Sequence, residues 1–224
     1  MKKRILSILL VFLFAVSVMP LSFAEATDTI TGKTAYSQIY KTGKTVYCNT
    51  YAGLYKVTLK NGRPKKVKRL VKYGVSSMIK QGSYIYYMSA TSGAGGSVCR
   101  VNVTTGKKKA LTDFLDEGDY AIANNTLYYS KTVWPEYDED EDYDDEYYDD
   151  DYYDDEDEGY TETYAANLDG SSPRLVDVTL KGPWKRSNVK SYRAYTKTKG
   201  KYIYAYLKNS KGKFYLGRTR VPVY

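Results

Sequence analysis

Apolar and polar residues alternate in short runs along this chain, and the same order of runs returns four times. In the clearest copy, SSMIKQG (76–82) and YIYYMSA (84–90) are followed by SVCRVNV (97–103) and KKALTD (108–113). Alternation over roughly four to eight residues is typical of a half-buried β-strand, and Gly or Asn after the first run favours a tight hairpin. Each copy therefore predicts short antiparallel strands, four in the complete units.

The copies align on an apolar residue that is followed by tyrosine in the second run. These pairs are Val46 with Tyr47, Ile85 with Tyr86, Leu127 with Tyr128, and Ile203 with Tyr204, in repeats of about 37–70, 76–113, 119–177 and 190–224. A period of about 40 residues with four strands is typical of a β-propeller blade, which is stable only when neighbouring blades cover its faces. We therefore predict an all-β, propeller-like domain of about four blades of four antiparallel strands.

The fourth repeat lacks a clear last strand. The segment DTITGKTAY (28–36) precedes the first repeat and favours a β-strand. We predict that it pairs with the last blade and closes the ring; the alternative is an open array of hairpins.

The first residues have the pattern of a secretory signal peptide. Lys2, Lys3 and Arg4 precede an apolar run at 5–19, and small residues follow. This order is typical of an exported protein, and the run is short for a spanning helix. We expect cleavage after residue 24, which leaves a single domain at 25–224, secreted or associated with the cell wall, with no further membrane span. The alternative is an uncleaved N-terminal anchor.

Charge is distributed very unevenly. The chain has 34 Lys and Arg against 26 Asp and Glu, but 17 of those acids lie in the segment 136–158. The rest of the mature chain holds 31 basic residues against nine acidic ones. A basic body favours polyanions. We expect an anionic cell-wall polymer or an unknown protein as partner, and no nucleic acid; the alternative is an ordinary solvated, lysine-rich surface.

The acidic insert EYDEDEDYDDEYYDDDYYDDEDE (136–158) adds six tyrosines to its acids. Such charge density predicts a disordered loop. Three roles remain open: weak Ca²⁺ binding, capture of a basic partner, or folding back on Lys181, Lys185, Arg186 and Lys190, which we prefer. The Ca²⁺ candidates are Asp138, Asp140, Asp142, Asp144, Asp145, Asp149, Asp150 and Asp151.

No pattern in the chain predicts an active site. Histidine is absent, which removes the commonest general base and the usual nucleophile–histidine pairs. SGAGGS (92–97) lacks the Lys-Ser/Thr ending of a phosphate loop. We therefore expect no enzyme activity and no cofactor other than Ca²⁺; a hydrolase that uses carboxylates within 113–119 is a minor alternative.

Binding residues are expected on the connections between strands. The stretch LKGPWKRSNVK (180–190) is predicted as a loop that shares one face with the acidic insert. Trp134, Trp184, Lys185 and Arg186 are therefore the candidates for contact with a ligand or partner; the alternative for each Trp is a packing role.

The two cysteines of the mature chain, Cys48 and Cys99, occupy strand positions where other repeats have tyrosine. This position predicts buried apolar thiols. A disulfide between them is the alternative, since export permits one.

The runs TETYAANLDGSSPRLV (161–176) and GLYKVTLKNGRPKKVKRL (53–70) resemble secreted bacterial propellers of the YWTD-like and TolB-like type. That family has five or six blades, and many such domains have no assigned activity. The resemblance implies a non-catalytic binding or scaffold module at the bacterial cell surface. The alternative is a cell-wall carbohydrate-binding repeat protein, because the tyrosine-rich hairpin at 200–217 is similar to glucan-binding repeats.

Overall fold

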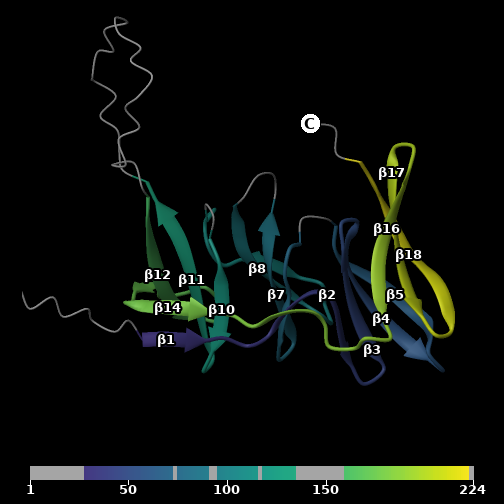
Figure 1. Cartoon of the computed structure of the whole chain (residues 1–224), viewed down its shortest axis with the longest axis horizontal. Coiled ribbons are helices and arrows are strands. Elements are labelled where there is room, and N and C mark those ends of the chain that lie inside the picture. Colours follow the sequence, from purple (N-terminus) through teal and green to yellow (C-terminus); the bar gives the residue numbers. More distant parts are fainter. Residues whose placement is uncertain (1–27, 73–74, 91–94, 116–117, 135–158, 222–224) are drawn as a thin grey trace, which may run out of the picture.

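A computed structural model describes residues 28–72, 75–90, 95–115, 118–134 and 159–221. These residues form strands, turns and loops without a helix, which confirms the all-β prediction. The four repeats form four sheets, named I to IV in chain order, and the segments between them form the remaining strands (Figure 1).

Sheet I contains β2 (Ala35–Thr42), β3 (Thr45–Thr50), β4 (Gly53–Lys60) and β5 (Arg63–Val71). Sheet II contains β6 (Ile79–Gln81), β7 (Tyr84–Ala90), β8 (Gly96–Asn102) and β9 (Lys108–Ala110). Sheet III contains β10 (Tyr120–Ala123), β11 (Thr126–Val133), β12 (Tyr160–Asn167) and β13 (Arg174–Leu175). Sheet IV contains β16 (Arg193–Lys199), β17 (Tyr202–Asn209) and β18 (Gly212–Arg220).

The strand register repeats from sheet to sheet. The aligning tyrosine is the third residue of the second strand in every sheet: Tyr47, Tyr86, Tyr128 and Tyr204. The turn before that strand has a positive φ at its first position in each case, at Gly43, Gly82, Asn124 and Gly200. Only Gly and, less readily, Asn adopt this conformation at low cost, which is why the hairpin turns could be recognised from sequence.

The N-terminal segment does not pair with sheet IV, so the predicted ring closure is wrong. Instead β1 (Asp28–Thr31) pairs in parallel with β14 (Val178–Lys181), and residues 35–36 begin β2. Next along the chain, β15 (Trp184–Ser187) pairs in parallel with β2 as a fifth strand of sheet I. The predicted loop at 180–190 is thus largely two strands. We call the two parallel pairs, β1–β14 and β15–β2, the seam.

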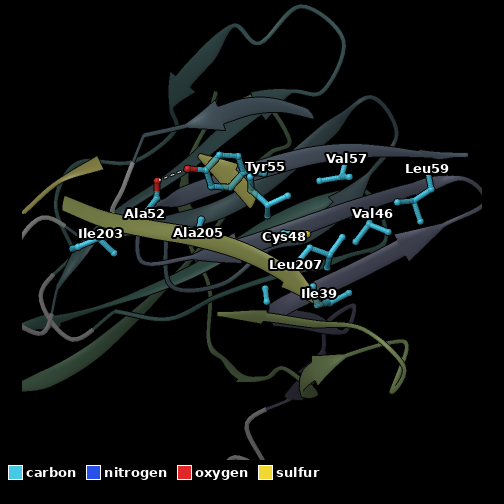
Figure 2. Packing of buried hydrophobic residues seen from close by; sticks show 12 residues of the cluster. Ile39, Val46, Cys48, Ala52, Tyr55, Val57, Leu59, Ile203, Ala205 and Leu207 are labelled. Atoms are coloured by element: carbon cyan, nitrogen blue, oxygen red, sulfur yellow. Dashed lines mark hydrogen bonds between the residues drawn. The ribbon is translucent and has the colours of Figure 1, made fainter. Parts of the chain in front are cut away.

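The sheets stand in a row in the order III, II, I, IV, with sheets III and IV at opposite ends (Figure 1). One apolar cluster fills each junction of the row. Between sheets I and IV, Tyr55 packs with Leu207 and Ala205, and its hydroxyl donates to the Ala52 carbonyl at 3.0 Å (Figure 2). At the next junction Tyr36 and Met78 exchange two backbone hydrogen bonds of 2.9 and 3.1 Å.

The junction between sheets II and III buries two tyrosine rings and bonds their hydroxyls. Tyr120 is 2 % exposed, and its hydroxyl donates to the Tyr86 carbonyl at 3.1 Å. The Tyr86 hydroxyl in turn donates at 2.9 Å to the carbonyl of Leu168, the residue after β12 of sheet III. A large apolar ring with a bonded hydroxyl is well suited to such a face, which accounts for the tyrosine-rich strands.

Candidate anion-binding groove

A basic groove lies where the chain passes from the seam into sheet IV. Strand β15 follows β2 in parallel, and its register shifts between Lys185 and Ser187. Arg186 therefore lies opposite two residues of β2, Ser37 and Gln38. Its Nε donates to the Gln38 side-chain oxygen at 2.7 Å, and this bond fixes the guanidinium beside β2.

The backbone after β15 is also fixed on sheet I. The Asn188 side chain bonds to Lys41 twice, accepting from its N–H and donating to its carbonyl, both at 2.8 Å. One residue earlier, the Ser187 hydroxyl accepts from the Val189 N–H at 3.0 Å. An amide side chain that pairs with a strand edge in this way substitutes for a further residue of a parallel strand. The backbone two residues before the next cation, Lys190, is thus held on sheet I.

The groove has a volume of about 520 Å³. Its lining consists of Gln38, Lys185, Arg186, Ser187, Lys190, Tyr192 and Arg193. A smaller hollow of about 260 Å³ adjoins it through the shared Tyr192, and it contains three more cations. These are Lys41, Lys44 and Lys60. Neither lining contains a carboxylate, so the groove presents donors and positive charge.

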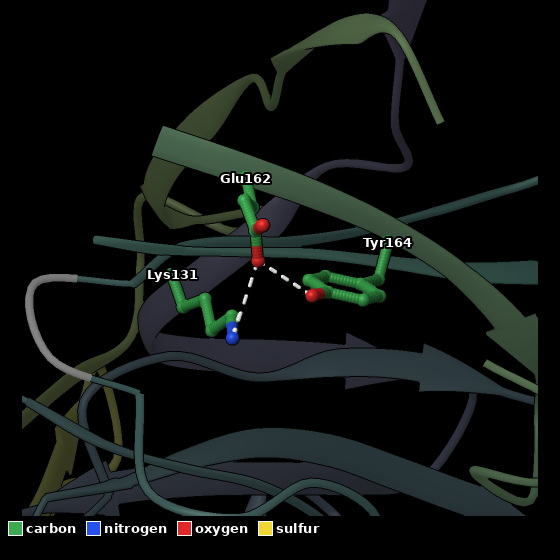
Figure 3. A network of polar contacts seen from close by, with 3 residues as sticks. All are labelled: Lys131, Glu162 and Tyr164. Atoms are coloured by element: carbon green, nitrogen blue, oxygen red, sulfur yellow. Dashed lines mark hydrogen bonds and ion pairs between the residues drawn. The ribbon is translucent and has the colours of Figure 1, made fainter. Parts of the chain in front are cut away.

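The basic character extends to the end of the chain. Residues 181–224 contain 13 Lys and Arg and no Asp or Glu. Between described residues, the structure contains one ion pair, and it lies on sheet III, where Lys131 Nζ is 3.2 Å from Glu162 Oε2 (Figure 3). The groove cations thus have no carboxylate partner in the described part of the chain. Unpaired cations converging on a groove are suited to an anionic ligand.

The Lys131–Glu162 pair shows how the chain neutralises a cation elsewhere. The Tyr164 hydroxyl donates to the same Glu162 oxygen at 2.5 Å, and Lys131 lies over the Tyr164 ring, 5.3 Å from its centroid (Figure 3). The bonds from Tyr164 and then from Lys131 lower the pKa of the Glu162 carboxyl. This closed network leaves no charge for a ligand, in contrast to the groove.

A second groove, of about 490 Å³, lies on sheet III under β14 and has the opposite chemistry. It is lined by Asp119, Ser130, Thr161, Thr163, Val176, Asp177, Val178, Thr179 and Leu180. Burial raises the pKa of the Asp119 carboxyl, and a hydrogen bond from the Tyr120 N–H, at 2.7 Å, partly opposes that rise. Asp119 belongs to the stretch considered for a hydrolase, and it shares this groove with a second carboxylate, that of Asp177, and with the hydroxyl of Ser130.

The predicted binding residues divide between two places. Lys185 and Arg186 line the basic groove, and Trp184 precedes them on β15 with a side chain that is 49 % exposed. Trp134 follows β11 on sheet III and lies against Gly159. The two tryptophans thus belong to different sheets. Gln38 and Arg193 are groove residues that the sequence did not indicate. The parallel pairing of β15 with β2 brings Gln38 to Arg186, and Arg193 enters the groove from the start of β16.

The cysteines are free thiols on different sheets. Cys48 is fully buried between sheets I and IV, and burial raises the pKa of its thiol. Cys99, on β8, is partly buried beside the cluster between sheets I and II. The disulfide considered as an alternative is not formed.

Several predictions fall on residues outside the described ranges. The signal peptide, the acidic insert and the eight Ca²⁺ candidates all lie there. Within the described ranges, no three His, Cys, Asp or Glu side chains gather closely enough to hold a metal ion. The same ranges contain no helix with the length and apolarity that crossing a membrane requires.

No protein-family model and no curated protein matches the chain. Two similar solved structures are the crystal structure of the N-terminal domain of Nup159 and the S. cerevisiae complex of Dbp5 with Nup159 and Gle1. Each matches with a TM-score of 0.37 and 10 % identity, over 76 % of this chain and 38 % of the other. This chain thus spans well under half of their length, and a likeness of this degree assigns it no family and no activity.

Proposed function

We propose that this chain is an exported, non-catalytic binding module of the bacterial cell surface, built on propeller-type blades, that holds an anionic polymer in the basic groove. The signal-like N-terminus and the resemblance to secreted bacterial propellers support export and a binding role. The observation that carries the proposal is the groove itself. Lys185, Arg186, Lys190 and Arg193 converge there without a carboxylate partner among the described residues.

The geometry of the groove supports a specific contact rather than a diffuse attraction. The hydrogen bond to Gln38 holds Arg186, and Asn188 holds the backbone before Lys190. Charged donors that are fixed in advance lose less conformational entropy when a ligand binds. A planar guanidinium also contacts two oxygens of a phosphate or carboxylate at once.

The test compares two pairs of exposed cations on opposite edges of sheet I. Lys185→Gln with Arg186→Gln removes two groove charges from β15, whereas Lys65→Gln with Lys66→Gln removes two exposed charges from β5 on the far edge. At up to about 1 kcal/mol for each exposed ion pair, the groove variant should bind about tenfold more weakly to long-chain polyphosphate. The control variant should lose much less.

Isothermal titration calorimetry on the mature chain measures both affinities at two salt concentrations, with a neutral glucan as the uncharged probe. Equal losses from both pairs would mean that only net charge matters, and the groove would then not be the site. Tighter binding to the glucan than to polyphosphate would favour the carbohydrate-binding alternative.

A further inference from the structure

The outer face of sheet IV is an array of tyrosines. On β16 to β18, Ala194, Ile203, Ala205, Leu207 and Leu216 are buried against sheet I. The alternate residues point away from sheet I, because successive side chains of a strand point to opposite faces. Five tyrosines gather there, and we call them the tyrosine face. They are Tyr195, Tyr202, Tyr204, Tyr206 and Tyr215.

The five rings form one connected row. Tyr195 stacks on Tyr206 with ring centroids 5.5 Å apart, and Tyr206 meets Tyr215 edge-on at 6.0 Å. Tyr215 lies 6.2 Å from Tyr204, which lies 6.4 Å from Tyr202. Tyr215 is nevertheless 53 % exposed, so the row is open to solvent. Ring contacts of this kind fix the side chains relative to one another.

Cations lie directly on the rings. Lys213 Nζ is 4.0 Å from the centroid of Tyr206 and 5.8 Å from that of Tyr195. Arg218 Cζ is 4.4 Å from the centroid of Tyr202. A cation–π contact fixes the position of a cation without neutralising its charge. The strands β16 to β18 contain no Asp or Glu, so this charge stays available to a ligand.

The tyrosine face is continuous with the basic groove. Arg193 lines the groove and begins β16, where Ala194 is buried and Tyr195 is on the outer side. Arg193 and Tyr195 are therefore neighbours on one side of one strand. A ligand that leaves the groove past Arg193 meets the Tyr195–Tyr206 stack and then Lys213.

We propose that the tyrosine face is a second subsite for the polymer held in the groove, and that this polymer carries phosphate groups. The inference rests on the proposed function of the groove. The tyrosine hydroxyls, Lys213 and Arg218 all supply hydrogen-bond donors along a row without any anionic group. A phosphate group accepts several such bonds at once, and an arginine contacts two of its oxygens. A chain of phosphates fits this row because its acceptors repeat along its length.

Chain length separates the two subsites. Triphosphate can occupy the groove alone, whereas long-chain polyphosphate can extend over the tyrosine face. Lys213→Gln with Arg218→Gln removes the two exposed cations and leaves every ring in place. This variant should bind long-chain polyphosphate roughly tenfold more weakly and triphosphate nearly as well as the unaltered chain, whereas Lys185→Gln with Arg186→Gln should weaken both.

A second variant tests the rings. Tyr215→Ser removes the exposed ring that contacts both Tyr204 and Tyr206. This variant should weaken binding of long-chain polyphosphate but not of triphosphate. Circular dichroism and thermal unfolding check that each variant is folded. Equal weakening of both probes by the Lys213 and Arg218 variant, or no weakening of either, would overturn the second subsite. If Lys213→Gln with Arg218→Gln abolishes binding and Lys185→Gln with Arg186→Gln does not, the groove is not a binding site and the tyrosine face is the site.

The chemical class of the ligand is tested in the same experiment. Polygalacturonate and poly-glutamate present carboxylates on a sugar and on a peptide chain, respectively. If either binds the unaltered chain more tightly than polyphosphate, and if Lys213→Gln with Arg218→Gln removes that preference, the assignment to a phosphate polymer is wrong.

Discussion

The two sheets at the ends of the row each have an outer face that no further sheet of the row covers, and the two faces differ. Sheet III has its outer face covered by the β1–β14 pair, and Gly32 after β1 lies so close to Ala121 that a Cβ on Gly32 would be 2.7 Å from the Ala121 Cβ. Within the described residues, the outer face of sheet IV has no covering strand and instead carries the tyrosine face (Figure 1).

This difference separates a capped end from an open end. The terminal unit of a stacked array exposes a face that an inner unit would bury, so it needs a cap or a soluble surface. On sheet III the parallel β1–β14 pair supplies the cap. On sheet IV the tyrosine hydroxyls and the cations over the rings make the surface soluble. The second solution leaves a whole row of aromatic rings open, whereas the cap on sheet III leaves the acidic groove under β14.

The largest effect is expected where sheet IV joins the row. A Cβ on Gly217 would lie 2.9 Å from the ring and hydroxyl of Tyr55, whose ring fills the junction with sheet I. Gly217→Ala should therefore lower the free energy of unfolding by about 1–3 kcal/mol, as overpacking does. Urea denaturation measures this loss. Gly182→Ala is the matched control, because its nearest neighbour would be at an ordinary 3.7 Å. Equal losses would show that Gly217 is not a packing constraint.

A smaller and local effect is expected at the cap of sheet III. Gly32→Ala should loosen β1 from sheet III at a cost of about 1 kcal/mol, at the lower end for overpacking, because β1 is a short strand at the end of the row. Hydrogen exchange should show faster exchange in β1 and β14 and no change in sheet IV. Ala121→Gly in the same chain should restore protection. If it does not, the close approach of these two residues does not hold the cap.

The smallest effect concerns the acidic groove of sheet III. Because burial raises the pKa of Asp119, the folded chain binds its proton more tightly than the unfolded chain does. The carboxylate therefore costs stability once the pH rises above the unfolded pKa of an aspartate, and the cost disappears below it. Asp119→Asn, whose side-chain oxygen can still accept from Tyr120, should raise the melting temperature slightly at pH 7 and leave it unchanged at pH 3. The exposed Asp113→Asn is the control. A larger gain at pH 3 than at pH 7 would contradict this sign.

Local patterns predicted the repeated sheets well. Alternation located the strands, and the turn residues Gly43, Gly82 and Gly200 located the hairpins, because antiparallel neighbours in sequence pair through short turns. The parallel pairs of the seam could not be predicted in this way. They join residues near 30 to residues near 180 without a turn, and parallel pairing leaves no local signature.

The candidate site was predicted only in part, for the same reason. Lys185 and Arg186 could be recognised as a basic cluster beside an exposed Trp. Gln38 belongs to β2, and only the seam brings it to Arg186, whereas Arg193 enters the groove from sheet IV. The aromatic content of sheet IV was visible in the sequence, but which tyrosines face outward depends on the side that packs against Tyr55.

The seam also constrains the order in which the molecule can assemble. Sheets II and IV and the strands β2 to β5 of sheet I pair across short connections, so each can form as soon as its own residues are present. The bonds between Asn188 and Lys41 join residues 147 positions apart. They cannot form until the part of the chain that follows sheet III is present. We therefore expect β1 and the outer edge of β2 to remain unpaired until late in folding, and the groove to be completed when β15 pairs with β2.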